Sequence, residues 1–287
     1  VTTNLRVWGM SSSRTVMATA QSDKGMGSLD RDGVETALLE LVGDWINERT
    51  PVIACGMVGS RQGWAEAGYN QTPCKTFGMD MAKAHTQDPR LSVHIIPGIS
   101  QASPADVMRG EETQIAGFLA LNPNWDGVLC LPGSHTKWVH VSADEIVSFQ
   151  TLMTGELFAA ISEDTVLKHS VGEGWDEDSL AKGVSDGMQR PERLAARLFS
   201  LRAEGLLNGM DKAAATARLS GLLIGTELAA TKPYWLGQNV AVIGEGTLSG
   251  HYVRALAAQG VPATQAAAER ITLAGLTAAF RTLKERA

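Results

Sequence analysis

The stretch LPGSHTKW, residues 131–138, decides the fold that we expect for this chain. It joins an apolar run, GVLCL (127–131), to an alternating run, KWVHV (137–141), and the two runs predict strands. The backbone must therefore reverse between them, and Gly133 supplies the freedom for that turn. Consecutive amides and hydroxyls in such a turn form a nest of donors for phosphate, to which Lys137 would add a positive charge. A plain hairpin, whose Ser and Thr bond their own backbone, is the alternative.

Similar turns follow other expected strands on both sides of this stretch. The buried run at 239–244 ends in GEGTL (244–248), whose glycines permit close approach of a nucleotide to the backbone before the next helix begins. The run at 51–56 enters the glycine-rich turn GMVGSRQGW (56–64), which either admits a ligand or is only an irregular loop. With 287 residues, the pattern predicts two mixed α/β units.

The composition excludes several classes of protein. Apolar residues make up 44% and charged residues 20% of the chain, which is ordinary for a globular protein. A formal net charge of −6 and a pI near 5.6 do not fit a typical nucleic-acid binder. No apolar run of 18 residues and no signal-peptide pattern is found, so we expect no membrane span and a cytoplasmic protein. The 3 cysteines are too scattered for a disulfide framework and suit a reducing compartment.

Two helices are expected to carry further features. The helix at 110–121 begins with Glu111 and Glu112, which either complement the helix dipole or act on a hydroxyl proton. Small residues line one face of this helix and of the helix at 213–230, where they include Gly221 and Gly225. Such stripes predict a close helix crossing, in a core or at a domain hinge. The letters GVSDG (183–187) match a nucleophile elbow, but no buried strand precedes them, so we exclude that motif.

Taken together, these sequence motifs resemble those of the 2-dehydro-3-deoxygalactonokinase family. The resemblance runs from residue 1 to about 285, begins with TTNLRVW (2–8), and is most specific in three motifs: VMRGEETQ (107–114), PGSHTKW (132–138) and SGLLIGTE (220–227). It implies an α/β, two-domain actin-like ATPase (ribonuclease-H-like) fold with an interdomain cleft. The N-terminal domain would cover 1–122 and be joined by the C-terminal helix at about 267–287. The nucleotide-binding domain would cover 123–266. The two helices with small-residue stripes would be the connecting helices at the hinge, and we expect them to cross each other near Gly221 and Gly225.

The resemblance also implies an activity. Such a kinase phosphorylates 2-dehydro-3-deoxy-D-galactonate at its 6-hydroxyl, using ATP and Mg²⁺, in galactonate breakdown. The implied partner is a small-molecule sugar acid, without nucleic acid or membrane, and a homodimer is compatible with it. Two other functions stay open at this point, a phosphohydrolase of the polyphosphatase type and a non-enzymatic sugar-acid-binding regulator on the same scaffold. The configuration at C4 of the sugar acid, galactonate or gluconate type, is also open.

The family's site residues are assigned to this sequence motif by motif. Catalytic roles fall on Glu112, Glu111 and Lys137. The ATP and phosphate contacts fall on Thr2, Thr3, Asn4, Gly133, Ser134, His135, Thr136, Gly244, Gly246 and Thr247. The sugar acid would contact Gly59, Ser60 and Arg109.

Two departures from the family pattern concern the metal. The first strand and its metal-facing Asp are missing from the start of this sequence, so we expect the protein ligand of Mg²⁺ upstream of Val1. The second phosphate loop usually begins with Asp-x-Gly, whereas Leu131 and Pro132 precede Gly133 here. This loop therefore supplies no carboxylate, and Mg²⁺ would be held through the ATP phosphates.

Overall fold

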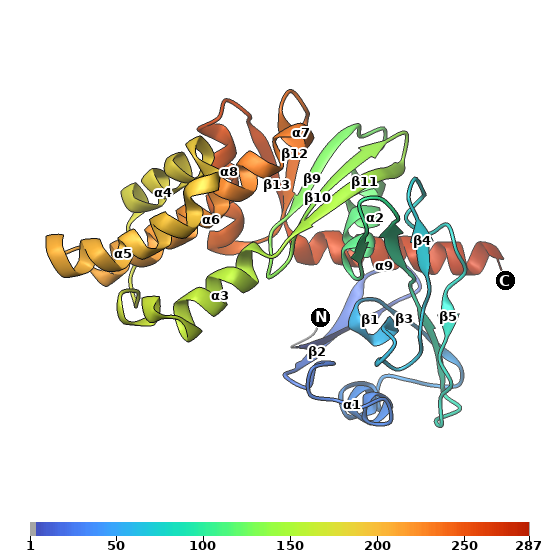
Figure 1. Ribbon diagram of the computed structural model, residues 1–287. Coiled ribbons are helices and arrows are strands. Elements are labelled where there is room, and N and C mark those ends of the chain that lie inside the picture. Colours follow the sequence, from blue (N-terminus) through green and yellow to red (C-terminus); the bar gives the residue numbers. More distant parts are fainter. Residues whose placement is uncertain (1–3, 287) are drawn as a thin grey trace. The chain divides into compact units, whose positions relative to one another are not determined.

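A computed structural model describes residues 4–286 (Figure 1). The chain divides into two compact units, and we describe each by itself. Unit 1 contains the residues up to Trp125, the short segment Ser142–Ser148 and the residues from Ala268 on. Unit 2 contains Asp126–Val141 and Phe149–Ala267.

Unit 1 combines small sheets with helices. Its first sheet is the antiparallel pair β1 (Leu5–Met10) and β2 (Val16–Ser22). Two further sheets have the strand orders β3-β6-β5 and β4-β7-β8, formed by β3 (Thr50–Ala54), β4 (Tyr69–Gln71), β5 (Ala82–Lys83), β6 (Leu91–Ile95), β7 (Gly98–Gln101) and β8 (Asp106–Met108). The helical elements are α1 (Gly33–Val42), the 3₁₀ turn η1 (Met57–Gly59), α2 (Glu111–Leu121) and α9 (Ala268–Arg286).

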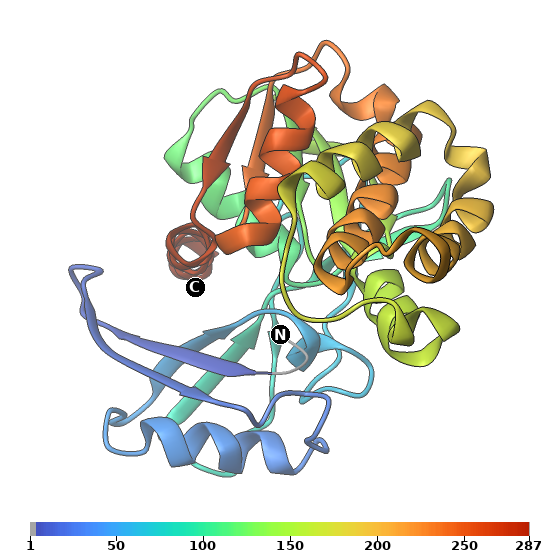
Figure 2. The same cartoon turned by 90° about the vertical axis from the view of Figure 1, so that its left-hand side faces the viewer.

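The position of α1 follows from its apolar face and from a polar clamp. Val34 and Leu38 of α1 join the core that also contains Val93 and Ile95 of β6, and Figure 2 shows α1 beside the β1–β2 hairpin. The apolar period ends with the helix at Val42, earlier than the sequence pattern over 33–48 predicts.

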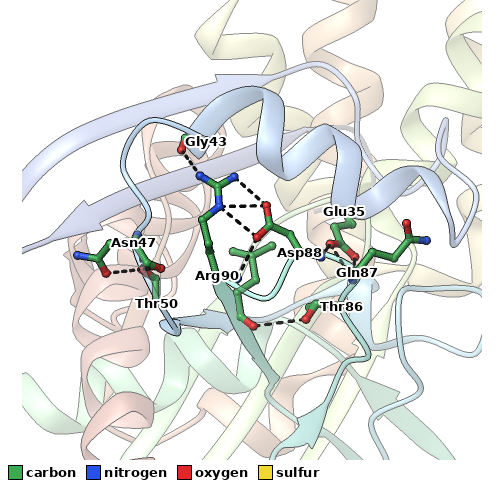
Figure 3. Close-up of polar contacts among 9 residues, drawn as sticks. Glu35, Gly43, Asn47, Thr50, Thr86, Gln87, Asp88 and Arg90 are labelled. Carbon is green, nitrogen blue, oxygen red and sulfur yellow. Dashed lines mark hydrogen bonds and ion pairs between the residues drawn. The ribbon is translucent and has the colours of Figure 1, made fainter.

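The polar clamp fastens α1 to the loop before β6 (Figure 3). The buried Glu35 carboxylate accepts hydrogen bonds from the amides of Gln87 (3.0 Å) and Asp88 (2.7 Å). Arg90 pairs with the Asp88 carboxylate (2.7 Å) and donates to the carbonyl of Gly43, just past α1 (3.2 Å). The bond from Arg90 holds the pKa of Asp88 below its usual value. These groups line a hollow of about 540 Å³, but the bonds just named explain their placement structurally.

Unit 2 is built on one five-stranded sheet with the order β11-β10-β9-β12-β13. Its strands are β9 (Gly127–Leu131), β10 (Thr136–Ser142), β11 (Glu145–Leu152), β12 (Val240–Ile243) and β13 (Ala263–Ala266). β10 pairs antiparallel with β9, whereas β9, β12 and β13 are parallel. Every residue of β9 and β12 is buried, as expected for central strands covered on both faces.

Helices pack on this sheet, and the core lies between them and the strands (Figure 1). The helical elements of unit 2 are α3 (Thr154–Asp164), η2 (Val166–His169), α4 (Glu177–Gln189), η3 (Pro191–Arg193), α5 (Leu194–Asn208), α6 (Lys212–Ala230), α7 (Lys232–Trp235) and α8 (Gly246–Ala257). The tip of the β10–β11 hairpin belongs to unit 1, where Ile146 forms a β-bridge with Cys74.

The small-residue stripes pack within the units. Gly221 and Gly225 of α6 lie against α4, where added Cβ atoms would meet the carbonyls of Leu180 and Val184. In unit 1, a Cβ on Gly117 of α2 would likewise meet the carbonyl of Ile271 in α9. The partner of each stripe is thus a helix of its own unit. The expected crossing of the 110–121 and 213–230 helices at these glycines is therefore wrong.

The partner stripe on α4 contains the letters GVSDG. Gly183 and Gly187 lie in the middle of this helix, and a Cβ on either would approach a carbonyl of α6, at 2.6 Å from Arg218 and 2.5 Å from Leu222. The exclusion of a nucleophile elbow agrees with this placement, because that motif needs a sharp turn between strand and helix.

Candidate active site

The acidic pair of unit 1 lies at the start of α2. Gly110 precedes the helix with a φ of 111°, a conformation that glycine adopts readily, and its N–H donates to Glu112 Oε2 at 2.5 Å. The Thr113 hydroxyl donates to Glu112 Oε1 at 3.0 Å, and the Glu112 side chain is 0% exposed. Burial, and then the negative charge of Glu111, raise the pKa of Glu112 to about 7, against the lowering effect of these bonds. Such a group changes its charge near neutral pH.

Two motifs that lie far apart in the sequence meet beside this pair. An added Cβ on Gly110 would lie 3.4 Å from Gly56 Cα, and one on Gly59 would lie 2.8 Å from Arg109 Nη1. The turn GMVGS therefore packs against the segment RGEE. Ser60, the next residue in the turn, is buried, and its N–H donates to the carbonyl of Met57 at 3.0 Å.

Arg109 is hydrogen-bonded through one guanidinium nitrogen, whereas the other two have no hydrogen-bond partner in the described part of the chain. Its Nη2 donates to the carbonyl of Ala67 at 2.6 Å, and its guanidinium lies 4.3 Å from the ring centroid of Tyr69. Its Nε and Nη1 atoms are buried and have no hydrogen-bond partner among residues 4–286. Buried donors without partners are rare in proteins and require an explanation. Nε and Nη1 lie on different edges of the guanidinium, so each needs an acceptor of its own, and a carboxylate oxygen of a ligand would be a charge-assisted acceptor for one of them.

In unit 2, the turns after β9 and β12 lie at one edge of the sheet. The strands are parallel neighbours, with Val128 opposite Val240 and Cys130 opposite Val242, so their carboxyl ends lie side by side. In open α/β sheets, ligands bind outside the carboxyl ends of the strands. The structure thus brings the 132–135 loop and the turn at Gly244 to the position that such a ligand requires.

The 132–135 loop rests on the start of α3. The N–H of Glu156 donates to the carbonyl of Ser134 at 3.0 Å, and the Glu156 carboxylate pairs with His135. Ser134 and His135 are exposed, and an added Cβ on Gly133 would meet no atom of the described residues within 4 Å. The loop therefore presents its backbone outward.

The residues after the loop point inward. Thr136 is buried, and its hydroxyl lies 3.2 Å from Tyr252 Oη. Lys137 is 4% exposed, and its Nζ donates back to the carbonyl of His135 at 3.4 Å. The ammonium group thus lies beneath the loop, where it adds positive charge.

A hollow of about 300 Å³ opens beside the loop. It is lined by Gly133, Ser134, Thr154, Gly155, Phe158, Leu223, Leu248 and Tyr252. Leu248 and Tyr252 belong to α8, which begins at Gly246 with a φ of 71°. Gly246 and Thr247 are exposed beside this hollow, whereas Gly244 is packed against Ser249. The sequence motifs did not predict that α3 and α6 line this hollow. The start of α3 and the apolar side chains of Phe158 and Leu223 belong to no ligand-binding motif.

Some expectations lie outside what the structure describes. Thr2 and Thr3 precede the described residues, which begin at Asn4, an exposed residue next to β1. Among residues 4–286, no group of three or more His, Cys, Asp or Glu side chains could hold a metal ion. No helix within the same range is long and apolar enough to cross a membrane.

Comparison with known proteins gives consistent matches along the chain. The family model for 2-keto-3-deoxy-galactonokinase matches residues 2–279. A Rhizobium meliloti (strain 1021) protein named "Probable 2-dehydro-3-deoxygalactonokinase DgoK1" is 37% identical over 293 residues, which cover 98% of this chain and 95% of that protein. The Escherichia coli (strain K12) protein named 2-dehydro-3-deoxygalactonokinase is 34% identical over 283 residues, covering 96% and 93%.

Solved structures agree with these matches. A crystal structure from Sinorhizobium meliloti, assigned to a 2-dehydro-3-deoxygalactonokinase, has a TM-score of 0.91 at 35% identity and covers 98% of this chain and 96% of its own. The ADPNP-bound activator of 2-hydroxyisocaproyl-CoA dehydratase from Clostridium difficile has a TM-score of 0.51 at 11% identity, with 99% and 94% covered. This second likeness concerns the fold alone. The predicted fold class, a two-domain α/β fold of the actin-like ATPase type, is confirmed.

Proposed function

This chain belongs to the 2-keto-3-deoxy-galactonokinase family and is a kinase of galactonate catabolism, and from this premise we propose how its own residues serve the reaction. The phosphoryl donor is ATP, and the acceptor is the 6-hydroxyl of 2-dehydro-3-deoxy-D-galactonate. The relatives lend no support to a phosphohydrolase or a non-enzymatic regulator. Phosphoryl transfer depends mainly on positioning and on neutralising charge, so each proposed role is one of these two or a proton transfer.

The acceptor side is assigned to unit 1, and the observation that carries it is the buried Glu112 carboxylate at the start of α2. A carboxylate with a pKa of about 7 is ionised in half of the molecules at neutral pH, which suits a general base. The acceptor hydroxyl would take the place of the Gly110 N–H as donor to Oε2. Glu111, which accepts from the Arg109 N–H at 3.1 Å, supports this role because its charge raises the pKa of Glu112.

Arg109 is assigned to the carboxylate of the sugar acid. Its unpartnered Nε and Nη1 are donors on different edges of the guanidinium, each available to one carboxylate oxygen, and the contacts to Ala67 and Tyr69 fix the plane of the guanidinium. Gly59 packs directly on this group, so its missing side chain leaves room for the guanidinium. Ser60 would complete the substrate contacts from the same turn.

The nucleotide side is assigned to unit 2. The backbone amides of Gly133–Lys137 would hold the phosphates, with the Lys137 side chain beneath the loop offsetting the charge that develops during transfer. The remaining nucleotide contacts are assigned to Ser134, His135, Thr136, Gly244, Gly246 and Thr247. Asn4, with Thr2 and Thr3 outside the described residues, keeps its sequence-based assignment to the first phosphate loop.

Mg²⁺ is assigned to the ATP phosphates. Mg²⁺ in kinases keeps several waters and is bound by one or two carboxylates plus phosphate oxygens. The described residues offer the 132–137 loop, with amides and hydroxyls but no carboxylate, and no cluster of three metal-ligating side chains. This donor set fits a phosphate-bound ion rather than one in a protein cage. When bound, the ion would neutralise phosphate charge.

The cellular compartment is part of the proposal. We place the enzyme in the cytoplasm, where ATP is available and where the 3 free cysteines would stay reduced.

The test is an ADP-release assay over a panel of 2-keto-3-deoxy sugar acids, including the galactonate and gluconate epimers at C4. We expect turnover with the galactonate type, no ADP release without a sugar acid, and a product that carries phosphate on O6 by ³¹P NMR. Equal ADP release with and without sugar acid would show a phosphohydrolase instead. Binding of sugar acid without any turnover would show a binding protein.

A further inference from the structure

One buried carboxylate in unit 2 has no role so far. Glu227 ends the word SGLLIGTE near the C-terminal end of α6, and its side chain is 2% exposed. Trp138 Nε1 donates to Glu227 Oε1 at 2.8 Å, and Tyr252 Oη donates to Oε2 at 2.9 Å. The Thr154 hydroxyl also donates to Oε2. These partners lie 89, 25 and 73 residues away in the sequence, so the carboxylate joins four elements of the unit.

The donors surround the 132–136 loop. Trp138 follows the loop in β10, and Thr154 is the first residue of α3, on which the loop rests. Tyr252 lies on α8 and also contacts the Thr136 hydroxyl at 3.2 Å. Thr154 and Tyr252 line the same hollow as Gly133. Glu227 therefore lies directly behind the wall of the proposed phosphate site.

An ionised carboxylate only accepts hydrogen bonds, and this fixes the direction of the network. Tyr252 stays protonated, because burial raises its pKa well above the ordinary value, and it gives its hydrogen to Glu227. Thr154 does the same. The Thr136 hydroxyl contacts Tyr252 Oη and also forms a hydrogen bond to Glu227, and toward either acceptor it is the donor. Burial raises the pKa of Glu227, and the bonds from Thr154, Trp138, Tyr252 and Thr136 oppose that rise. The charge on Glu227 thus decides how the hydroxyls beside the loop are oriented.

We propose that Glu227 is a positioning residue for nucleotide binding, which holds Thr136, the start of α3 and the hydroxyl of Tyr252 in the arrangement that the phosphate loop needs. This inference rests on the proposed function of the loop. It does not make Glu227 a catalytic residue, because the carboxylate acts only through the side chains that it orients.

Glu227→Gln is the test, because it keeps the shape of the side chain, removes its charge and replaces one acceptor oxygen by an NH₂ donor. The Trp138 indole can only donate, so the amide oxygen must face it and the NH₂ group must face the two hydroxyls. Both hydroxyls would then have to reverse direction. We expect the Kd for MgADP by titration calorimetry and the KM for ATP to rise about tenfold, with the KM for the sugar acid within about twofold of wild type.

Asp186→Asn is the matched control. Asp186 lies on α4 and pairs with Arg197 at 2.8 Å and with Arg218 of α6, so it also ties α6 to a neighbour by a carboxylate, without contacting the loop residues. We expect this variant to lower the melting temperature and leave the Kd for MgADP unchanged. If Glu227→Gln melts lower but binds MgADP like wild type, Glu227 is only structural and the inference is overturned.

Three further outcomes are also decided by these measurements. If Glu227→Gln does not fold, Tyr252→Phe removes one donor and its link to Thr136, and a Kd equal to wild type overturns the inference. If wild type binds MgADP but turns over no sugar acid, the proposed function fails while the Kd comparison still decides the role of Glu227. If wild type binds no MgADP, both fail.

Discussion

Replacing Glu112 by Gln tests the proposed general base, and the surroundings of the residue set the size of the effect. The amide keeps the shape of the side chain and can still accept from the Gly110 N–H, which the carboxylate accepts at 2.5 Å. It cannot take a proton from the acceptor hydroxyl. Loss of a general base typically costs about 10²–10⁴-fold in rate. We expect kcat to fall about 100-fold or more, with the KM for ATP unchanged.

The pH dependence of the wild-type enzyme gives the second readout. Glu112 must be ionised to accept a proton, and its pKa is about 7. The rate of ADP release should therefore fall about tenfold per pH unit well below pH 7 and level off above it. In Glu112→Gln this acidic limb should be absent. Glu111→Gln should keep the limb but move it to lower pH, because the charge of Glu111 raises the pKa of Glu112.

As the pH rises, the free energy of unfolding should fall while the activity rises. The folded state binds the Glu112 proton more tightly than the unfolded state, because the pKa rises from 4.5 to about 7 on folding. The free energy of unfolding therefore falls as the pH rises from about 4.5 through 7. At about 1.4 kcal/mol per pKa unit, ionised Glu112 costs about 3 kcal/mol at pH 8. Glu112→Gln should then melt at or above the wild-type temperature at pH 8. Near wild-type kcat, or an acidic limb that persists in the variant, would refute the assignment.

Gly225→Val should overpack the contact between α6 and α4, which typically costs about 1–3 kcal/mol, while kcat and both KM values of the folded enzyme stay at wild type. Gly250→Ala is its control, and a melting temperature equal to that control would contradict the packing argument. Arg109→Gln should raise the KM for the sugar acid at least tenfold and leave the KM for ATP unchanged; equal changes in both would remove Arg109 from the substrate site. Burial raises the pKa of Cys55 and Cys74 to about 11, so a thiol reagent at pH 7.5 should react only slowly with the native protein. After denaturation the reagent should react readily with all 3 thiols. Rapid reaction of these thiols in the native protein would contradict those pKa values.

Local patterns predicted the strands and turns well where the chain changes character abruptly. The run GVLCL followed by Pro132 and Gly133 marks a buried strand and a turn, and the structure has β9 and the loop there. The acidic pair at 111–112 likewise marks the start of a helix. The functional assignment came from several long sequence motifs taken together, because no single turn distinguishes a phosphate loop from a plain hairpin.

Contacts between distant segments could not be predicted in the same way. The stripe at Gly221 and Gly225 indicated a close crossing but not its partner, since small residues occur on several helices. The signal for α4 was present in Gly183 and Gly187, which share the spacing of four residues and lie in a polar amphipathic helix. The surroundings of Glu227 depend on side chains up to 89 residues away, and no local pattern encodes them.

The way in which α2 meets α9 also determines the order in which the chain can fold as it is synthesised. α2 ends at Leu121, whereas α9, which contacts it through Gly117 and Gly275, begins at Ala268. All of unit 2 is made in between, so it can fold while unit 1 still lacks a helix. At about 5–20 residues/s, the intervening roughly 150 residues take about 7–30 s to make. A ribosome that stops between Ala267 and the end of α9 releases a chain with a complete second unit and an open first one, a species that chaperones and proteases recognise.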